Sequence, residues 1–150
     1  MTLLASSMHP STMADFRKLE VWQKAHDLVL AVNDVAHSIR GAEYTSLRSQ
    51  IIRASMSIDA NIVEGRNQRT DRKFAQYLDT AVNSANELEA HFIMARDFGV
   101  MSESSYKGLR NRLVQVRKML HGLINKLSGL PPRKPKPDPG PEPEADSAGR

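Results

Sequence analysis

Apolar residues recur at alternating intervals of three and four positions in four successive segments of the chain. This spacing places side chains on one face of an α-helix and does not fit a β-strand, whose faces alternate every two residues. The predicted helices cover about residues 19–39, 46–64, 71–98 and 103–127. Because only a few residues connect them, neighbours must run antiparallel. The pattern predicts an all-α fold, an antiparallel up-down-up-down four-helix bundle.

Residues suited to helix ends flank these segments. Thr45, Thr70 and Ser102 are predicted N-caps, because a hydroxyl can accept a hydrogen bond from a free backbone amide. Glycine readily adopts the left-handed conformation that closes a helix. We therefore expect a closing role for the glycines that punctuate the pattern, which are Gly41, Gly65, Gly99 and Gly129.

Proline placement sets the predicted limits of the folded unit. Seven of the eight prolines lie between residues 131 and 143, and none lies between 11 and 130. The last segment alternates proline with charged residues, so it cannot bury enough apolar surface to offset its ordering entropy. We expect a disordered N-terminal extension at 1–13, a bundle at 14–129 and a disordered proline-rich tail at 130–150.

Composition and the lengths of the apolar runs indicate the cellular compartment in which the protein is expected. The chain has no cysteine, which fits a reducing environment. No stretch approaches the roughly 18 consecutive apolar residues of a membrane-spanning helix, and the N-terminus lacks the basic start of a signal peptide. We expect a soluble, cytoplasmic protein with no membrane association.

The second predicted helix carries closely spaced polar residues beside its apolar face. Arg53, Ser57, Asn61 and Glu64 project along one strip. Half-buried polar groups need partners. We predict that these residues, with Glu87 of the third helix, form a structural polar network that sets how the helices fit together.

An alternative is that carboxylates and a histidine form a metal or acid–base site inside the bundle. Glu64, Glu87 and His91 would supply it. Di-metal bundles use Glu-x-x-His pairs, whereas Glu87 and His91 are four residues apart and no second pair exists. We therefore expect no catalytic residues, no metal and no cofactor.

A second apolar strip on the second helix points away from the predicted core. It consists of Ile52, Met56 and Val63, with Asp59 between them. Exposed apolar strips usually mark interfaces. The strip predicts a homo-oligomer, and the alternative is a set of scattered surface aliphatics.

The excess positive charge belongs to the bundle. Residues 128–150 hold four basic and four acidic residues, so the formal net charge of +4 comes from the rest of the chain. The predicted nucleic-acid-binding residues are an outward strip of the fourth helix, Arg110, Arg117 and Lys118, and the second turn, Arg66, Arg69, Arg72 and Lys73. The alternative is a solvated basic face, because no base-reading motif, aromatic stacking platform or glycine-rich phosphate loop is present.

Four runs carry a family resemblance. They are DFRKLEVWQKAHDL (15–28), QIIRASMSIDANIVEG (50–65), FAQYLDTAVNSANELE (74–89) and ARDFGVMSESSY (95–106). They resemble the bacterial four-helix-bundle proteins encoded in intervening sequences of large-subunit ribosomal RNA, to which the accessory variability protein of diversity-generating retroelements is similar. The usual motif is S-I-P-A-N-I-A-E-G. Here Asp59 replaces its proline, which predicts a straighter helix, and Val63 replaces its second alanine.

The resemblance implies a cytoplasmic bundle that assembles into a ring, with a pentamer as the expected form, and no enzymatic activity. For the retroelement relatives it also implies contact with nucleic acid and a reverse transcriptase. The leading hypothesis is thus a non-enzymatic oligomer that binds RNA, DNA or a nucleic-acid enzyme through its basic surface. The alternative is a protein-binding adaptor or scaffold that uses the strip of the second helix or the proline-rich tail, with no nucleic-acid role.

Overall fold

The computed structural model describes residues 15–129, and within them it contains helices and no strand. The predicted all-α fold with four helices is confirmed. The predicted extension at 1–13 and tail at 130–150 lie outside the described residues. The elements are η2 (Phe16–Lys18), α1 (Glu20–Ala36), η3 (Ala42–Tyr44), α2 (Thr45–Arg66), α3 (Asp71–Asp97) and α4 (Glu103–Ser128).

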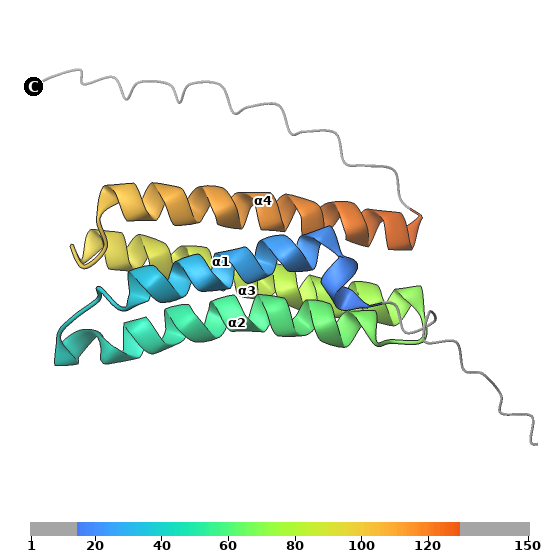
Figure 1. Ribbon diagram of the computed structural model, residues 1–150, viewed down its shortest axis with the longest axis horizontal. Coiled ribbons are helices and arrows are strands. Elements are labelled where there is room, and N and C mark those ends of the chain that lie inside the picture. The colour runs from blue at the N-terminus through green and yellow to red at the C-terminus, as the bar shows by residue number, and fades with distance from the viewer. Residues whose placement is uncertain (1–14, 130–150) are drawn as a thin grey trace, which may run out of the picture.

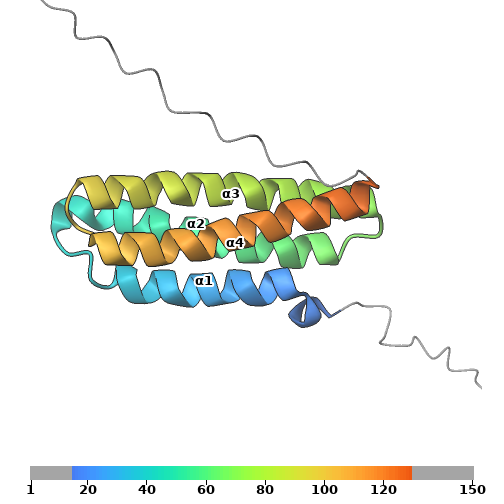
Figure 2. The same ribbon diagram turned by 90° about the horizontal axis from the view of Figure 1, so that it is seen from above.

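The four α-helices lie side by side along one long axis, and consecutive helices are joined at alternate ends (Figure 1). α1 packs against α2 and α4, and α3 packs against the same two helices; within residues 15–129 the diagonal pairs make no close contact. Figure 2 shows the same arrangement from above. One end, here called the α2–α3 end, carries the α2–α3 turn, η2 and the last residues of α4. The other, the α3–α4 end, carries the α3–α4 turn and η3.

The core lies between the four helices and is mainly aliphatic. Each helix contributes side chains from the predicted apolar face, and Leu28, Ile58, Leu88 and Leu113 are fully buried. Burying one such side chain stabilises the fold by roughly 1.5–3 kcal/mol. Phe92 is the largest of the fully buried side chains. The spacing of apolar residues thus identifies the core correctly.

Two helix ends differ from the prediction. α1 stops at Ala36, but Ile39 in the following turn is still fully buried, so the apolar spacing outlasts the helix. α2 begins at Thr45 itself, which has a helical backbone and is therefore not an N-cap. The 3-10 helix η3 runs directly into α2, and Tyr44 precedes the first residue without a side-chain cap.

The other predicted caps are confirmed. Thr70 Oγ1 accepts a hydrogen bond from Lys73 N at 3.2 Å, and Ser102 Oγ accepts one from Ser105 N at 3.1 Å. Gly129 closes α4 in the left-handed conformation with φ 64°.

Gly65 has a different role from the predicted one. It lies inside α2, where a Cβ added to it would lie 2.7 Å from Phe74 Cδ2 and 2.9 Å from Tyr77 Cβ. Its missing side chain lets α2 and α3 approach closely near their turn, and it does not close the helix. None of the helices in residues 15–129 combines the length and hydropathy that a membrane crossing requires.

Candidate nucleic-acid interface

The α2–α3 turn carries exposed positive charge. Arg69, Arg72 and Lys73 are exposed, and none of them forms an ion pair with any residue in 15–129. Arg66 is half-buried, with its guanidinium 5.9 Å from the centre of the Phe74 ring. The four predicted basic residues of this turn therefore divide into one that rests on the core and three that face solvent.

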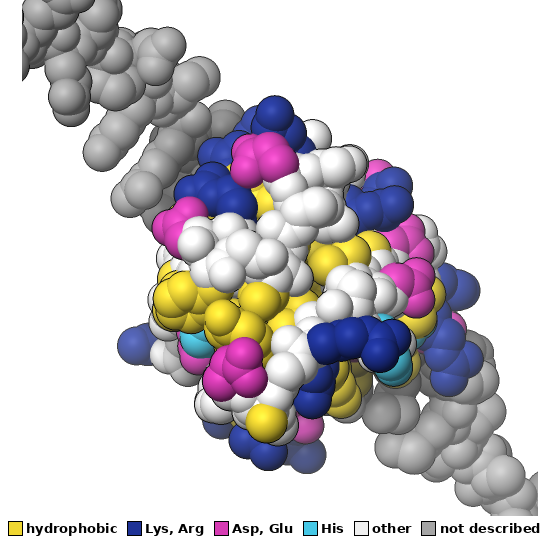
Figure 3. Space-filling view, turned by 90° about the vertical axis from the view of Figure 1, so that its left-hand side faces the viewer, with side chains coloured by type: hydrophobic (Ala, Val, Ile, Leu, Met, Phe, Trp, Pro, Cys, Tyr) yellow, Lys and Arg dark blue, Asp and Glu magenta, His cyan; other side chains and the backbone are white. Residues whose placement is uncertain are grey.

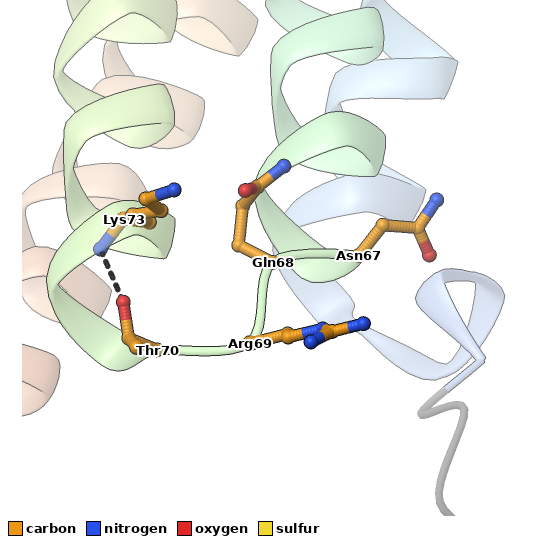
Figure 4. A pocket seen from close by; sticks show the side chains of 5 residues that line it. All are labelled: Asn67, Gln68, Arg69, Thr70 and Lys73. Atoms are coloured by element: carbon orange, nitrogen blue, oxygen red, sulfur yellow. Dashed lines mark hydrogen bonds between the residues drawn. The ribbon is translucent and has the colours of Figure 1, made fainter.

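The turn also forms a shallow hollow lined by Asn67, Gln68, Arg69, Thr70 and Lys73. Figure 4 shows the backbone amide of Lys73 bonded to Thr70, with the side chains of Asn67 and Arg69 extending away from Lys73. Free amides and the positive end of the helix dipole at the start of α3 add to the local positive potential.

Charge bookkeeping at this turn is simple. Residues 66–73 hold four basic side chains and one acidic side chain, Asp71, so their net charge is 4 − 1 = +3. An arrangement of exposed cations around a helix start can hold phosphate groups without reading bases. The chemistry available here is therefore backbone-directed, sequence-independent contact with a polyanion.

Two of the three residues of the predicted basic strip of α4 are paired with a carboxylate. Arg117 Nη1 donates to Glu89 Oε2 at 2.5 Å and to Asn86 Oδ1 at 3.1 Å, and Arg110 Nε lies 3.5 Å from Glu89 Oε1. The Glu89 and Arg117 side chains are only 21% and 22% exposed. Lys118 is exposed and has no ion pair within the described residues. The predicted outward direction is therefore wrong for Arg117, whereas Arg110 is exposed but paired with the same carboxylate on α3.

Asp59 faces α1, so its predicted position in an outward strip is also wrong. Its carboxylate accepts a hydrogen bond from Trp22 Nε1 at 2.8 Å and lies 3.2 Å from His26 Nδ1. The Trp22 and His26 rings stack with centroids 4.9 Å apart. α2 is continuous through this position. Asp59 thus joins α1 to α2 within one chain.

The rest of the predicted oligomer strip is unevenly exposed. Met56 is 55% exposed, whereas Ile52 and Val63 are half-buried. On α1, Leu30 is also among the exposed large apolar residues. An apolar contact surface that uses the α2 strip would therefore centre on Met56.

Part of the predicted polar network comes together between α2 and α3. Ser57 Oγ and Ser84 Oγ are 2.8 Å apart, and Asn61 Nδ2 donates to Ser57 O at 2.8 Å and to Ser57 Oγ at 3.2 Å. Ser84 is buried and completes the group. Arg53 and Glu64 are exposed and do not take part in these hydrogen bonds. The group is small, and the contact between Ser57 and Ser84 suits a role in fixing the register of α2 against α3.

Glu87 is paired differently from the prediction. Its exposed carboxylate lies 3.6 Å from His91 Nε2 on the same helix, and both His91 ring nitrogens are buried without a hydrogen-bond partner in the described part of the chain. Glu64 does not join them. Within residues 15–129 no three His, Asp or Glu side chains gather as metal ligands would, so the alternative metal site lacks a ligand set there.

The α3–α4 end exposes apolar side chains. Figure 3 shows hydrophobic residues gathered on this end. Phe98 is 56% exposed, with its ring centre 6.0 Å from that of Tyr44, and Met94 is exposed nearby on α3. Arg96 lies 4.3 Å from the Tyr106 ring centre, and its hydrogen bond to Asp97 raises the pKa of its guanidinium.

The chain is similar to a solved structure and matches the model of one protein family. A solved structure described as a protein with unknown function from the S23 ribosomal protein family of Bacteroides thetaiotaomicron VPI-5482 is similar to this chain, with a TM-score of 0.65 and 22% identity. The match covers 69% of this chain and 97% of that chain, and at this identity it shows a shared fold. No curated protein matches the chain significantly. Residues 17–122 match the model of the 23S rRNA-intervening sequence protein family. The resemblance seen in the sequence is confirmed, and the chain belongs to the 23S rRNA-intervening sequence protein family.

Proposed function

We propose that this protein is a cytoplasmic, non-enzymatic bundle that binds nucleic acid through the exposed cations of the α2–α3 turn. The observation that supports this most is the contrast in pairing. Arg69, Arg72 and Lys73 are exposed without an ion pair in residues 15–129, whereas Arg110 and Arg117 are held by a carboxylate. Only unpaired cations can neutralise phosphates without first giving up a protein partner.

The charge arrangement favours the phosphate backbone as the ligand. Lys and Arg contacts to phosphates give affinity and orientation, while sequence is read through base edges. RNA is the first ligand to test, because the family is linked by name to 23S rRNA. A reverse transcriptase or another nucleic-acid enzyme is a further partner under this proposal. The bundle would contact the nucleic acid that the enzyme has already bound.

We further propose that the up-down-up-down bundle assembles into a ring, with a pentamer as the expected form. The exposed Met56 on α2 and Leu30 on α1 support an apolar contact between copies. A ring would repeat the α2–α3 turn around one axis. Simultaneous contacts from several copies raise the overall affinity well above that of one turn.

The nucleic-acid test is a charge reversal of the turn in the full chain. Binding of fluorescein-labelled single-stranded RNA, and of a DNA duplex, is measured by anisotropy over a range of salt concentrations. We expect the triple variant Arg69→Glu, Arg72→Glu, Lys73→Glu to bind at least about tenfold more weakly, because each lost phosphate contact lowers the salt slope by about one.

A matched control separates the site from net charge. The variant Arg40→Glu, Lys107→Glu, Arg112→Glu makes the same change in charge at exposed positions outside the turn. We expect it to retain most of the affinity. Equal losses in the two variants would assign binding to net charge alone, and no binding by the wild type would reject the proposed function.

The assembly test uses light scattering after size exclusion. We expect Met56→Glu to dissociate the assembly, because a charge at an exposed apolar contact opposes its burial. Met94→Glu, at an exposed methionine near the C-terminal end of α3, is the control and should leave the mass unchanged. A monomeric wild type contradicts the ring.

A second candidate function is that of a protein-binding adaptor. The exposed Met56 of the α2 strip favours it, since an apolar side chain open to solvent suits a protein partner better than a polyanion. The adaptor hypothesis assigns binding to the α2 strip or to the proline-rich segment 130–150. Deleting 130–150 should leave RNA affinity unchanged, whereas an adaptor that uses this segment would lose its partner.

A further inference from the structure

Glu89 has an unusual position relative to the basic surface. It is a largely buried carboxylate on α3 that contacts two arginines of α4, Arg110 and Arg117, at 3.5 Å and 2.5 Å. One negative charge against two positive charges leaves this group with a net charge of 2 − 1 = +1. Half of the positive charge of these two α4 arginines is therefore already balanced within the protein.

The two arginines are held to different degrees. Arg117 is 22% exposed and also donates to Asn86 Oδ1, so it is anchored between α3 and α4. Arg110 is 46% exposed, and its longer contact with Glu89 is an ion pair at the edge of the group. Exposed ion pairs are weak and compete with other anions. Of the two arginines, Arg110 is therefore the one that loss of the Glu89 charge would release most readily.

We propose that Glu89 is an internal counter-charge that excludes the α4 arginines from nucleic-acid binding and so confines contact to the α2–α3 turn. This inference rests on the proposed function and adds a residue that sets the extent of the binding surface. A phosphate that reaches α4 must displace a carboxylate already in contact with Arg110 and Arg117. Without the charge of Glu89, the same arginines become available to the ligand.

The chain supplies a matched pair of variants for the test. Glu89→Gln removes one negative charge and keeps an amide oxygen that can accept from Arg117. Glu87→Gln, two residues earlier on α3, makes the same change of charge at an exposed carboxylate that lies beside His91 and forms no ion pair with an arginine of residues 15–129. Any effect of net charge is common to both variants, and any effect on Arg110 and Arg117 belongs to Glu89→Gln alone.

The experiment measures anisotropy of labelled single-stranded RNA against salt concentration with the full-length variants. We expect Glu89→Gln to bind several-fold more tightly than Glu87→Gln and to show a salt slope steeper by roughly 0.7 for each newly contacted phosphate. Arg110→Gln should change affinity by less than about twofold in the wild type, and it should cancel the gain in Glu89→Gln. This non-additivity is the mark of a coupled pair.

Each outcome has a defined meaning. Equal affinities and slopes for Glu89→Gln and Glu87→Gln overturn the proposal and leave binding by the α2–α3 turn intact. If wild type and Glu89→Gln both fail to bind RNA, the proposed function fails as well. Should Glu89→Gln not fold by circular dichroism, Arg110→Gln alone decides, because a loss as large as that of the turn variant shows that Arg110 was never masked.

Discussion

The two ends of the bundle are built from the same element, a short turn between two long helices, yet they expose opposite chemistry. The α2–α3 turn presents Arg69, Arg72 and Lys73 to solvent. At the α3–α4 end, Phe98 and Met94 are exposed instead. The first surface suits a polyanion, and the second suits an apolar partner.

What the two ends share is the framework that fixes the turns. The helix that follows each turn begins with a hydroxyl cap, Thr70 for α3 and Ser102 for α4. Each turn also has a glycine close by, Gly65 or Gly99, although for different reasons. The difference between the ends therefore resides in exposed side chains that the fold does not require, which is why one framework can carry either chemistry.

The largest expected effect is on the free energy of unfolding, and it distinguishes substitutions at Gly65 from those at Gly99. At Gly65 any side chain meets Phe74 and Tyr77, so overpacking should cost roughly 1–3 kcal/mol. Gly99 has φ 75°, and an added Cβ would lie within 4 Å of no described residue other than its chain neighbours. We expect asparagine to be worse than alanine at Gly65 because it is larger. At Gly99 asparagine should be better than alanine, because asparagine tolerates the left-handed region.

Urea unfolding of the four single variants checks this reversal, with the loss of helical circular dichroism as the signal. The same order of asparagine and alanine at both positions would show that one kind of constraint, steric or conformational, acts at both ends.

The next effect tests the shared framework. Thr70→Ala and Ser102→Ala should each destabilise the protein by about 1 kcal/mol, because each removes one capping hydrogen bond of similar length. Thr70→Ser and Ser102→Thr keep the hydroxyl and serve as controls. Thermal unfolding measures the losses, and a large cost at only one end would show that the two turns are not stabilised alike.

A smaller effect is expected at the exposed apolar side chains. Phe98→Ser should cost about 0.5 kcal/mol, the low end for an aromatic pair, because the Phe98 ring is 56% exposed and its centre lies 6.0 Å from that of Tyr44. Phe92→Ser is the contrasting variant, since Phe92 is fully buried. A cost at Phe98 that approaches the one at Phe92 would indicate that another copy or partner covers Phe98 in solution.

The smallest effect concerns the cations of the α2–α3 turn. Arg72 lies in the first turn of α3, where the helix dipole disfavours positive charge, so Arg72→Gln should stabilise the protein by roughly 0.3–1 kcal/mol at low salt. The gain should shrink as salt is added. Arg112→Gln, in the interior of α4, is the control and should show no such gain in differential scanning calorimetry.

Much of the fold could be predicted because one apolar spacing, which indicates both a helix and its buried face, recurs in four segments of the sequence. The apolar spacing located all four helices, and hydroxyl residues identified the caps at Thr70 and Ser102. Thr45 misled because a 3-10 helix precedes it, so the chain is already helical where a cap was expected. Ile39 extended the pattern beyond α1 because a buried side chain need not belong to a helix.

The site was harder to predict because its electrostatics depend on pairs far apart in sequence. Periodicity gives the face on which Arg117 lies, but it does not show that Glu89, 28 residues away, meets it. Asp59 was misplaced for the same reason, since its partners Trp22 and His26 lie on another helix. The turn cations were easier, because charges close together in a short connection stay together.

The contact between Trp22 and Asp59 makes the chain its own spectroscopic probe. Trp22 is the single tryptophan of the sequence, and its indole is bonded to α2 while its ring is stacked on His26. Indole emission responds to the hydrogen bonds of the indole and to the rings beside it. Intrinsic fluorescence therefore reports on the contact between α1 and α2 without any label. Assembly, ligand binding and unfolding can therefore be followed by the emission of Trp22, which changes wherever the contact between α1 and α2 changes.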